Sequence, residues 1–150
     1  MKKSIKGVLA VLFLLVGSFS FAQLRSVPAE VTNAFKVKFP DGNDVSWHDK
    51  LSSWQASFVE KGVKTEAWFS SKGEWKETDK EMEYSALPEE VKVGVSKSRY
   101  SDWKPGSVTT ILKKDKELQY RIYVEKSSLV QKKYIYFNEK GVLQREVQSL

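Results

Sequence analysis

Residues 66–75 read EAWFSSKGEW, and residues 134–143, near the other end of the chain, read YIYFNEKGVL. In both stretches an aromatic residue precedes a phenylalanine, and a glycine follows that phenylalanine after three intervening residues. Alternating side chains followed by a short glycine-containing connection are typical of two antiparallel strands joined as a hairpin. The same hairpin is therefore predicted twice, which suggests that the chain consists of two copies of one unit.

The segments that precede the two hairpins also match. VPAEVTNAF, residues 27–35, aligns with LPEEVKVGV, residues 87–95, and the offset of 60 positions grows to 68 at the hairpin glycines. The offset grows only across turn-rich stretches, where insertions accumulate. We therefore predict a single domain over residues 23–150 that contains two repeats, 26–84 and 85–150.

Each repeat is predicted to begin with a helix. Pro28 and Pro88 mark the first turns, because an N–H is unpaired there in any case and its loss is tolerated. Val31 and Phe35 are four residues apart, which places them on one apolar stripe. The second helix is expected to be weaker, because Gly94 lowers its helix propensity.

After each predicted helix, apolar residues alternate with polar ones in four short runs, which predicts four antiparallel strands per repeat. Two small units bury more core when they share a sheet, so the predicted fold class is α+β: one continuous sheet of about eight strands with two helices on one face. The residues expected to point toward the helices are Val45, Trp47, Trp54, Ala56, Phe58, Val63, Thr65, Ala67, Phe69, Trp75, Val108, Thr110, Leu112, Leu118, Tyr120, Ile122, Val124, Lys133, Ile135, Phe137 and Leu143.

The first 22 residues have the pattern of a secretory signal peptide. Three lysines precede the apolar run VLAVLFLLVG, and Ser20 and Ala22 provide the small-x-small exit that a signal peptidase recognises. The apolar segment is shorter than the roughly 20 residues that a membrane-spanning helix needs. No cysteine follows, which excludes a lipoprotein. We expect cleavage after Ala22 and a soluble protein that is periplasmic or secreted.

Composition argues against several kinds of function. The absence of cysteine excludes thiol catalysis and thiolate metal sites, and the one histidine, His48, is followed by Asp49, which points to the opposite face of a strand. The acidic segment 79–90 is interpreted as a link between the repeats and the start of the second helix. We therefore predict no enzyme activity, no cofactor and no metal ion.

Without residues 1–22 the chain has 22 basic and 19 acidic residues, a net charge of +3. Basic and acidic residues are interleaved along the sequence, which argues against nucleic-acid binding.

A helix covers only one side of a sheet, so the other side is left to water or to a partner. Four aromatic residues are expected on this helix-free side: Trp68, Tyr123, Tyr134 and Tyr136. Lys64, Glu66, Arg121, Lys132 and His48 are expected to share it. Two interpretations remain open. Aromatic residues among charges are typical of a protein-binding surface, and large aromatic residues also pair across strands for packing alone.

With its two units laid out, the chain resembles the PepSY-like family, also described as beta-lactamase-inhibitor-like. These are small exported proteins built from tandem modules of one helix and four strands. The resemblance rests on VPAEVTNAFKVKFP and LPEEVKVGVSKSRY, and on AWFSSKGEW and YIYFNEKGVL. It implies an inhibitor-like architecture in which the sheet face opposite the helices clamps a partner. Related modules in protease propeptides imply restraint of an enzyme. No functional position carries over residue by residue.

The leading hypothesis is an exported module that binds a protein or peptide of the cell envelope through the helix-free side, in the manner of an inhibitor that restrains an envelope enzyme. The alternative is a structural or homo-oligomeric envelope protein that uses the same aromatic residues against a second copy. Neither a nucleic-acid partner nor stable insertion into a membrane after signal removal is expected.

Overall fold

The computed structural model describes residues 25–115, 117–126 and 131–149, so the predicted signal peptide lies outside the described residues. Each half of the described chain has one α-helix followed by four strands. The elements are α1 (Ala29–Lys38), β1 (Gly42–Asp49), β2 (Trp54–Glu60), β3 (Val63–Phe69), β4 (Trp75–Met82), the 3-10 turn η1 (Tyr84–Ala86), α2 (Glu89–Lys97), β5 (Lys104–Lys113), β6 (Leu118–Lys126), β7 (Gln131–Asn138) and β8 (Leu143–Gln148).

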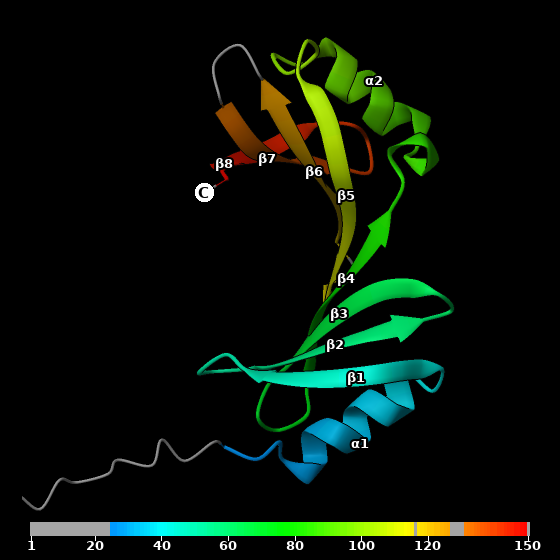
Figure 1. The fold of residues 1–150 in the computed structure, drawn as a ribbon, viewed down its shortest axis with the longest axis vertical. Coiled ribbons are helices and arrows are strands. Elements are labelled where there is room, and N and C mark those ends of the chain that lie inside the picture. Colours follow the sequence, from blue (N-terminus) through cyan, green and yellow to red (C-terminus); the bar gives the residue numbers. More distant parts are fainter. Residues whose placement is uncertain (1–24, 116, 127–130, 150) are drawn as a thin grey trace, which may run out of the picture.

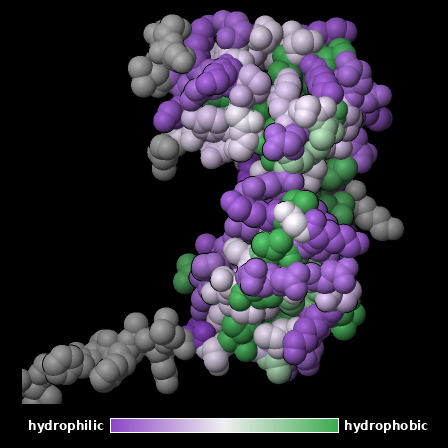
Figure 2. Space-filling model, turned by 45° about the vertical axis from the view of Figure 1, so that its right-hand side comes forward, coloured by the Kyte–Doolittle hydropathy of each residue, from purple (hydrophilic) through white to green (hydrophobic). Residues whose placement is uncertain are grey.

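The eight strands form one sheet in which spatial order follows chain order, and each strand is antiparallel to its neighbours. The sheet is strongly twisted and curved, with both helices on its outer, convex side (Figure 1). The space-filling view shows the opposite side as a hollow between the two ends of the molecule (Figure 2). The predicted fold class is confirmed. Within the described residues, no helix has the length and apolar character needed to span a membrane.

The helices begin where the sequence pattern places them. Pro28 and Pro88 occupy the positions immediately before α1 and α2, and acidic residues follow each of them in the first turn, where they favour the helix dipole. Val31 and Phe35 are the buried residues of α1. The predicted apolar stripe is therefore the surface by which α1 packs on the sheet.

The core consists of two apolar clusters, one beneath each helix. In the first, the Phe35 ring lies 4.8 Å from the Phe58 ring in an edge-to-face arrangement. The first cluster contains Val31, Phe35, Phe39, Trp54, Ala56, Phe58, Ala67 and Phe69. The second contains Leu87, Val91, Val95, Tyr100, Val108, Tyr120, Ile122, Val124, Ile135 and Phe137. Each helix thus packs on the strands that follow it in the chain.

Most residues expected beneath the helices are found there, but three of them are exposed: Val45, Val63 and Leu112. Trp54 is 2% exposed, and Trp47 and Trp75 are partly buried at the edge of the first cluster. Val45 is exposed, contrary to the prediction. The reason is local: the β1–β2 register shifts before Ser46 and Asp44 has a φ of 53°, so regular alternation along β1 begins only after this irregularity.

The repeated glycine of the two hairpins has a steric explanation. Gly73 and Gly141 have φ values of 80° and 71°, a region that favours glycine. A Cβ atom on Gly141 would lie 1.9 Å from the carbonyl oxygen of Glu90 in α2, and one on Gly73 would lie 2.5 Å from that of Glu30 in α1. Each hairpin turn therefore presses its backbone against the first turn of its helix.

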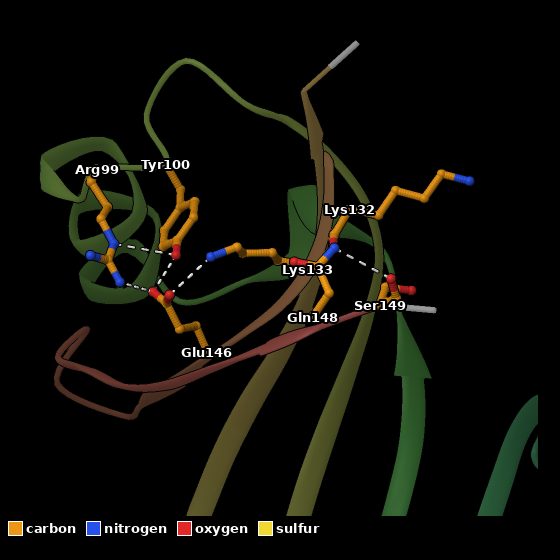
Figure 3. Close-up of polar contacts among 7 residues, drawn as sticks. All are labelled: Arg99, Tyr100, Lys132, Lys133, Glu146, Gln148 and Ser149. Carbon is orange, nitrogen blue, oxygen red and sulfur yellow. Dashed lines mark hydrogen bonds and ion pairs between the residues drawn. The ribbon is translucent and has the colours of Figure 1, made fainter. Parts of the chain in front are cut away.

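A cluster of polar side chains fastens the chain that follows α2 to the last two strands (Figure 3). Tyr100 and Arg99 both donate hydrogen bonds to Oε2 of Glu146 in β8, and Lys133 Nζ in β7 lies 3.0 Å from its Oε1. These three donors lower the pKa of the Glu146 carboxyl to about 2, with Arg99 contributing most. The ionised carboxylate is thus part of the fold.

Replacing Glu146 with Gln is expected to lower the free energy of unfolding at pH 7 by about 1–2 kcal/mol, because charge-assisted hydrogen bonds are lost. The folded-state pKa lies below the ordinary value of 4.5. The stabilisation is therefore complete above about pH 4.5 and is lost as the pH falls toward 2. Urea unfolding at several pH values measures this, with the surface variant Glu139→Gln as control. A difference that persists unchanged at pH 2 contradicts the prediction.

Candidate functional site

The helix-free face is the concave side of the sheet, formed by the side chains that alternate with those of the core. Residues directly opposite each other in antiparallel strands lie on the same face. Phe69 pairs with Trp54 on the core side, so Trp68 and its partner Gln55 point the other way. In the same manner Phe137 pairs with Tyr120 in the core. The side chains of the even-numbered residues of β3 and β7 therefore point toward the concave side.

All four aromatic residues predicted for this face lie on it, but they are not brought together. Trp68 in β3 lies between Gln55 and Glu77 of the neighbouring strands. The other three form a group on β6 and β7, which we call the tyrosine cluster: Tyr123, Tyr134 and Tyr136. Trp68 and the tyrosine cluster occupy opposite halves of the face, so a single partner would have to span the central strands to touch both.

The tyrosine cluster combines aromatic packing with cations. The rings of Tyr123 and Tyr134 are 5.6 Å apart in an edge-to-face arrangement. The guanidinium of Arg145 in β8 lies 4.0 Å from the centre of the Tyr136 ring, and that of Arg121 lies 5.7 Å from the Tyr134 ring. Tyr136 is only 7% exposed, while Tyr123, Tyr134 and Trp68 keep part of their surface open.

The charged residues expected on this face are also there. Glu66 and Arg121 lie near its centre, opposite Asp79 and Tyr136 respectively. His48 in β1 pairs with Gln55 and is exposed, and Lys132 pairs with Glu125 at the far end of β7. Among the described residues, no group of three or more His, Cys, Asp or Glu side chains is arranged to hold a metal ion.

The middle of the helix-free face contains a depression of about 420 Å³, which we call the central hollow. Strands β1 to β6 all contribute to its lining. The charged residues that line it are four acidic and two basic: Asp44, Glu66, Asp79, Glu81, Lys64 and Arg121. Ser46, Ser57 and Thr109 add hydroxyl groups. The hollow therefore carries an excess of two negative charges when all its carboxyls are ionised.

Asp79 is the most unusual residue of the central hollow. It is 4% exposed, and its Oδ2 lies 3.3 Å from Nη1 of Arg121. Its other carboxylate oxygen, Oδ1, is buried without a hydrogen-bond partner. Burial raises the pKa of this carboxyl to about 7; Arg121 opposes that shift, whereas Glu77 and Glu66 reinforce it. Asp79 therefore titrates near neutral pH.

The sequence interpretation missed Asp79, because segment 79–90 was expected to be a link and a helix start. That assignment is wrong for residues 79–82, which form the second half of β4. β4 reads WKETDKEM, and without apolar alternation nothing in it predicts a central strand. Its position between β3 and β5 comes from the sheet topology, and that position places Asp79 beneath the hollow.

The model of the family described as "Putative beta-lactamase-inhibitor-like, PepSY-like" matches residues 52–145, well over half of the chain. A solved structure from Bacteroides eggerthii, described as putative periplasmic, is 25% identical and superposes with a TM-score of 0.78, covering 83% of this chain and 90% of its own.

Two further solved structures have the same fold. A DUF2874 family protein from Bacteroides uniformis is 24% identical, with a TM-score of 0.78 over 82% of this chain and 90% of its own. A BLIP-like protein from Bacteroides fragilis is 23% identical, with a TM-score of 0.73 over 83% of this chain and 88% of its own. A search among curated proteins found no match. None of the similar proteins indicates an enzyme family.

Proposed function

The chain belongs to the beta-lactamase-inhibitor-like, PepSY-like family, and on that premise we propose that it is an exported module that binds a protein or peptide of the cell envelope through its helix-free face. The observation that carries this proposal is the face itself: a concave, uncovered sheet surface with aromatic and charged side chains. The similarity to a protein of B. eggerthii described as periplasmic supports an envelope location.

The dimensions of the face suit a protein partner. Eight strands spaced by about 4.8 Å give a surface about 34 Å wide, and a typical stable interface buries about 800 Å² on each partner. Tyr, Trp and Arg dominate the binding energy of such interfaces. Trp68 and Tyr134 are the partly exposed aromatic anchors we favour on the two halves, and Tyr123 lies next to Tyr134.

Tyr136 has a different role within this proposal. Its ring is mostly covered and lies against the Arg145 guanidinium, so it supports the surface from below. A partner would then meet Arg145 rather than the tyrosine ring. Restraint of an envelope enzyme is the form of binding we favour, because the family description names inhibitors and a concave sheet can enclose a protruding loop near an active site.

The test is affinity capture from an envelope extract with tagged residues 23–150. We expect a discrete set of proteins to be enriched, and the double variant Trp68→Ala with Tyr134→Ala to recover them at least tenfold less, since truncation of anchors costs about 2 kcal/mol or more each. The thermal midpoint should move little. The control variant is Val37→Ala on α1, which removes a side chain that is 85% exposed outside this face.

Two results would count against the proposal. Equal recovery of the same proteins by the wild type and the double variant would show that the aromatic anchors do not bind them. Sedimentation across protein concentrations provides the second result: a tight dimer that the double variant converts to a monomer would favour the alternative, a homo-oligomeric envelope protein that covers this face with a second copy.

A further inference from the structure

We propose that the central hollow receives a basic side chain, lysine or arginine, that the partner protein presents to the helix-free face. This inference rests on the proposed function and specifies the chemistry of the partner at one position. Three features of the hollow support it: an acceptor without a donor at its floor, an excess of carboxylates around it, and a size suited to one side chain.

The first feature is the unused hydrogen-bonding capacity of Asp79. A carboxylate accepts about four hydrogen bonds, and burial without them is costly. Asp79 is almost completely buried, yet Oδ1 has no partner among the described residues, and Oδ2 has one contact, with Arg121 at 3.3 Å. A donor that arrives with the partner would satisfy an acceptor that the fold leaves unsatisfied.

Arg121 is placed so that it can share Asp79 with an incoming cation. Its Nη2 donates to Thr109 Oγ1 at 3.3 Å, and its guanidinium lies over the Tyr134 ring. The same guanidinium also lines the hollow. Because Arg121 has these other partners, a shift away from Asp79 would not leave it unpaired.

The second feature is the local charge. Glu66 faces Asp79 from β3 and accepts a hydrogen bond from Ser57 Oγ at 3.4 Å. Glu81 and Asp44 add two more carboxyls, and among the described residues only Lys64 and Arg121 are basic in the lining. Without residues 1–22 the chain has a net charge of +3, so the hollow, with its excess of carboxyls, has the opposite sign. A low-dielectric depression of one sign attracts groups of the other.

The third feature is size and chemical character. A volume of about 420 Å³ is near the lower end of the roughly 300–1,000 Å³ range for ligand sites, enough for one long side chain and not for a folded element. An acidic side chain would be repelled by the four carboxyls, and an apolar one would bury them unpaired. The described residues hold no cluster suited to a metal ion. A basic side chain fits best.

Binding of a cation should be coupled to the protonation of Asp79. Glu66 from β3, Glu77 and Glu81 on β4, and Arg121 from β6 set the charge around this group. Burial raises the pKa of Asp79 to about 7, and a bound cation favours the ionised form. Affinity for a basic group should therefore rise by up to about tenfold between pH 6 and pH 8.

The direct experiment titrates residues 23–150 with N-acetyl-arginine methylamide, N-acetyl-lysine methylamide and the neutral analogue N-acetyl-citrulline methylamide, followed by NMR chemical shifts. We expect saturable shifts around Asp79, Glu66 and Arg121 for at least one basic probe at pH 8. They should be weaker at pH 6 and absent with citrulline and with Asp79→Asn. The inference would be overturned if the citrulline probe gave shifts equal to those of the basic probes, or if the shifts persisted in Asp79→Asn. It would also be overturned if the basic probes gave no shifts, or gave shifts only at residues away from the hollow.

Capture from the envelope extract separates this inference from the proposed function. Asp79→Asn should recover the partner at least tenfold less than the wild type, and the control is Glu139→Gln, an exposed carboxyl-to-amide change outside the hollow. Full recovery by Asp79→Asn, combined with loss in the Trp68 and Tyr134 double variant, would overturn the basic-side-chain inference and leave the proposed function standing. Full recovery by both variants would overturn the proposed function as well.

Discussion

Replacing Gly141 with alanine is expected to destabilise the protein by about 3–4 kcal/mol or to prevent folding of its C-terminal half. The left-handed backbone, with φ at 71°, costs a non-glycine residue about 1–2 kcal/mol. The added Cβ would also lie 1.9 Å from the Glu90 carbonyl oxygen. Backbone shifts that relieve such overpacking cost typically 1–3 kcal/mol. Urea unfolding followed by circular dichroism measures the loss.

Gly62, in the turn between β2 and β3, provides the matched control. Its φ is 80°, but nothing lies within 4 Å of the position where a Cβ would stand. Gly62→Ala should therefore lose only the backbone contribution, about 1–2 kcal/mol. Equal destabilisation of the two variants would mean that the contact between Gly141 and α2 contributes nothing to stability. The equal spacing of phenylalanine and glycine in the two hairpins would then reflect turn geometry alone.

Replacing Asp79 with asparagine is expected to stabilise the protein at pH 8, by up to about 4 kcal/mol. The folded-state pKa of about 7 lies above the ordinary 3.8, so between these values the folded state binds the proton that the unfolded state has released. Wild-type stability therefore falls as the pH rises from about 4 to 7 and then levels off, by about 1.4 kcal/mol for each unit of pKa difference. Asparagine does not titrate and avoids this loss.

The measurement is the thermal midpoint of both proteins between pH 4 and pH 9. The two curves should lie close together near pH 4 and separate toward pH 8, whereas Asp44→Asn, an exposed change in the same hollow, should follow the wild type. A destabilised Asp79→Asn at pH 8 would show that the ion pair with Arg121 outweighs the burial of the carboxylate. A substitution that stabilises the folded protein is characteristic of a position kept for function.

Much of the fold could be predicted because local pattern and global packing agree. Alternation in β2, β3, β6 and β7 indicates strands with one apolar side, and the core clusters contain most of the residues so selected. The aromatic–x3–glycine spacing indicates hairpins, and both were found. Gly94, interpreted as a weakness of the second helix, has a packing reason: a Cβ there would lie 2.0 Å from the Gly141 carbonyl oxygen.

The candidate site could be predicted only in part. The side of the sheet on which Trp68 or Tyr136 lies follows from alternation along one strand. The covering of Tyr136 by Arg145 depends on the β7–β8 register, which a single sequence does not reveal. The central hollow depends on six strands at once, and its floor lies in β4, whose side chains are mostly polar. Long-range register, rather than local propensity, assembles it.

The interior is divided into two apolar clusters, and the junction between them lies in the middle of the sheet. Each helix and its own strands form a compact body, and the two bodies are joined by the backbone ladder between β4 and β5 and by the Asp79–Arg121 contact, which reaches across β5. Bending at this junction would widen or narrow the mouth of the concave surface and would leave both clusters packed. A group bound in the central hollow, which strands of both halves line, would therefore oppose or favour such bending.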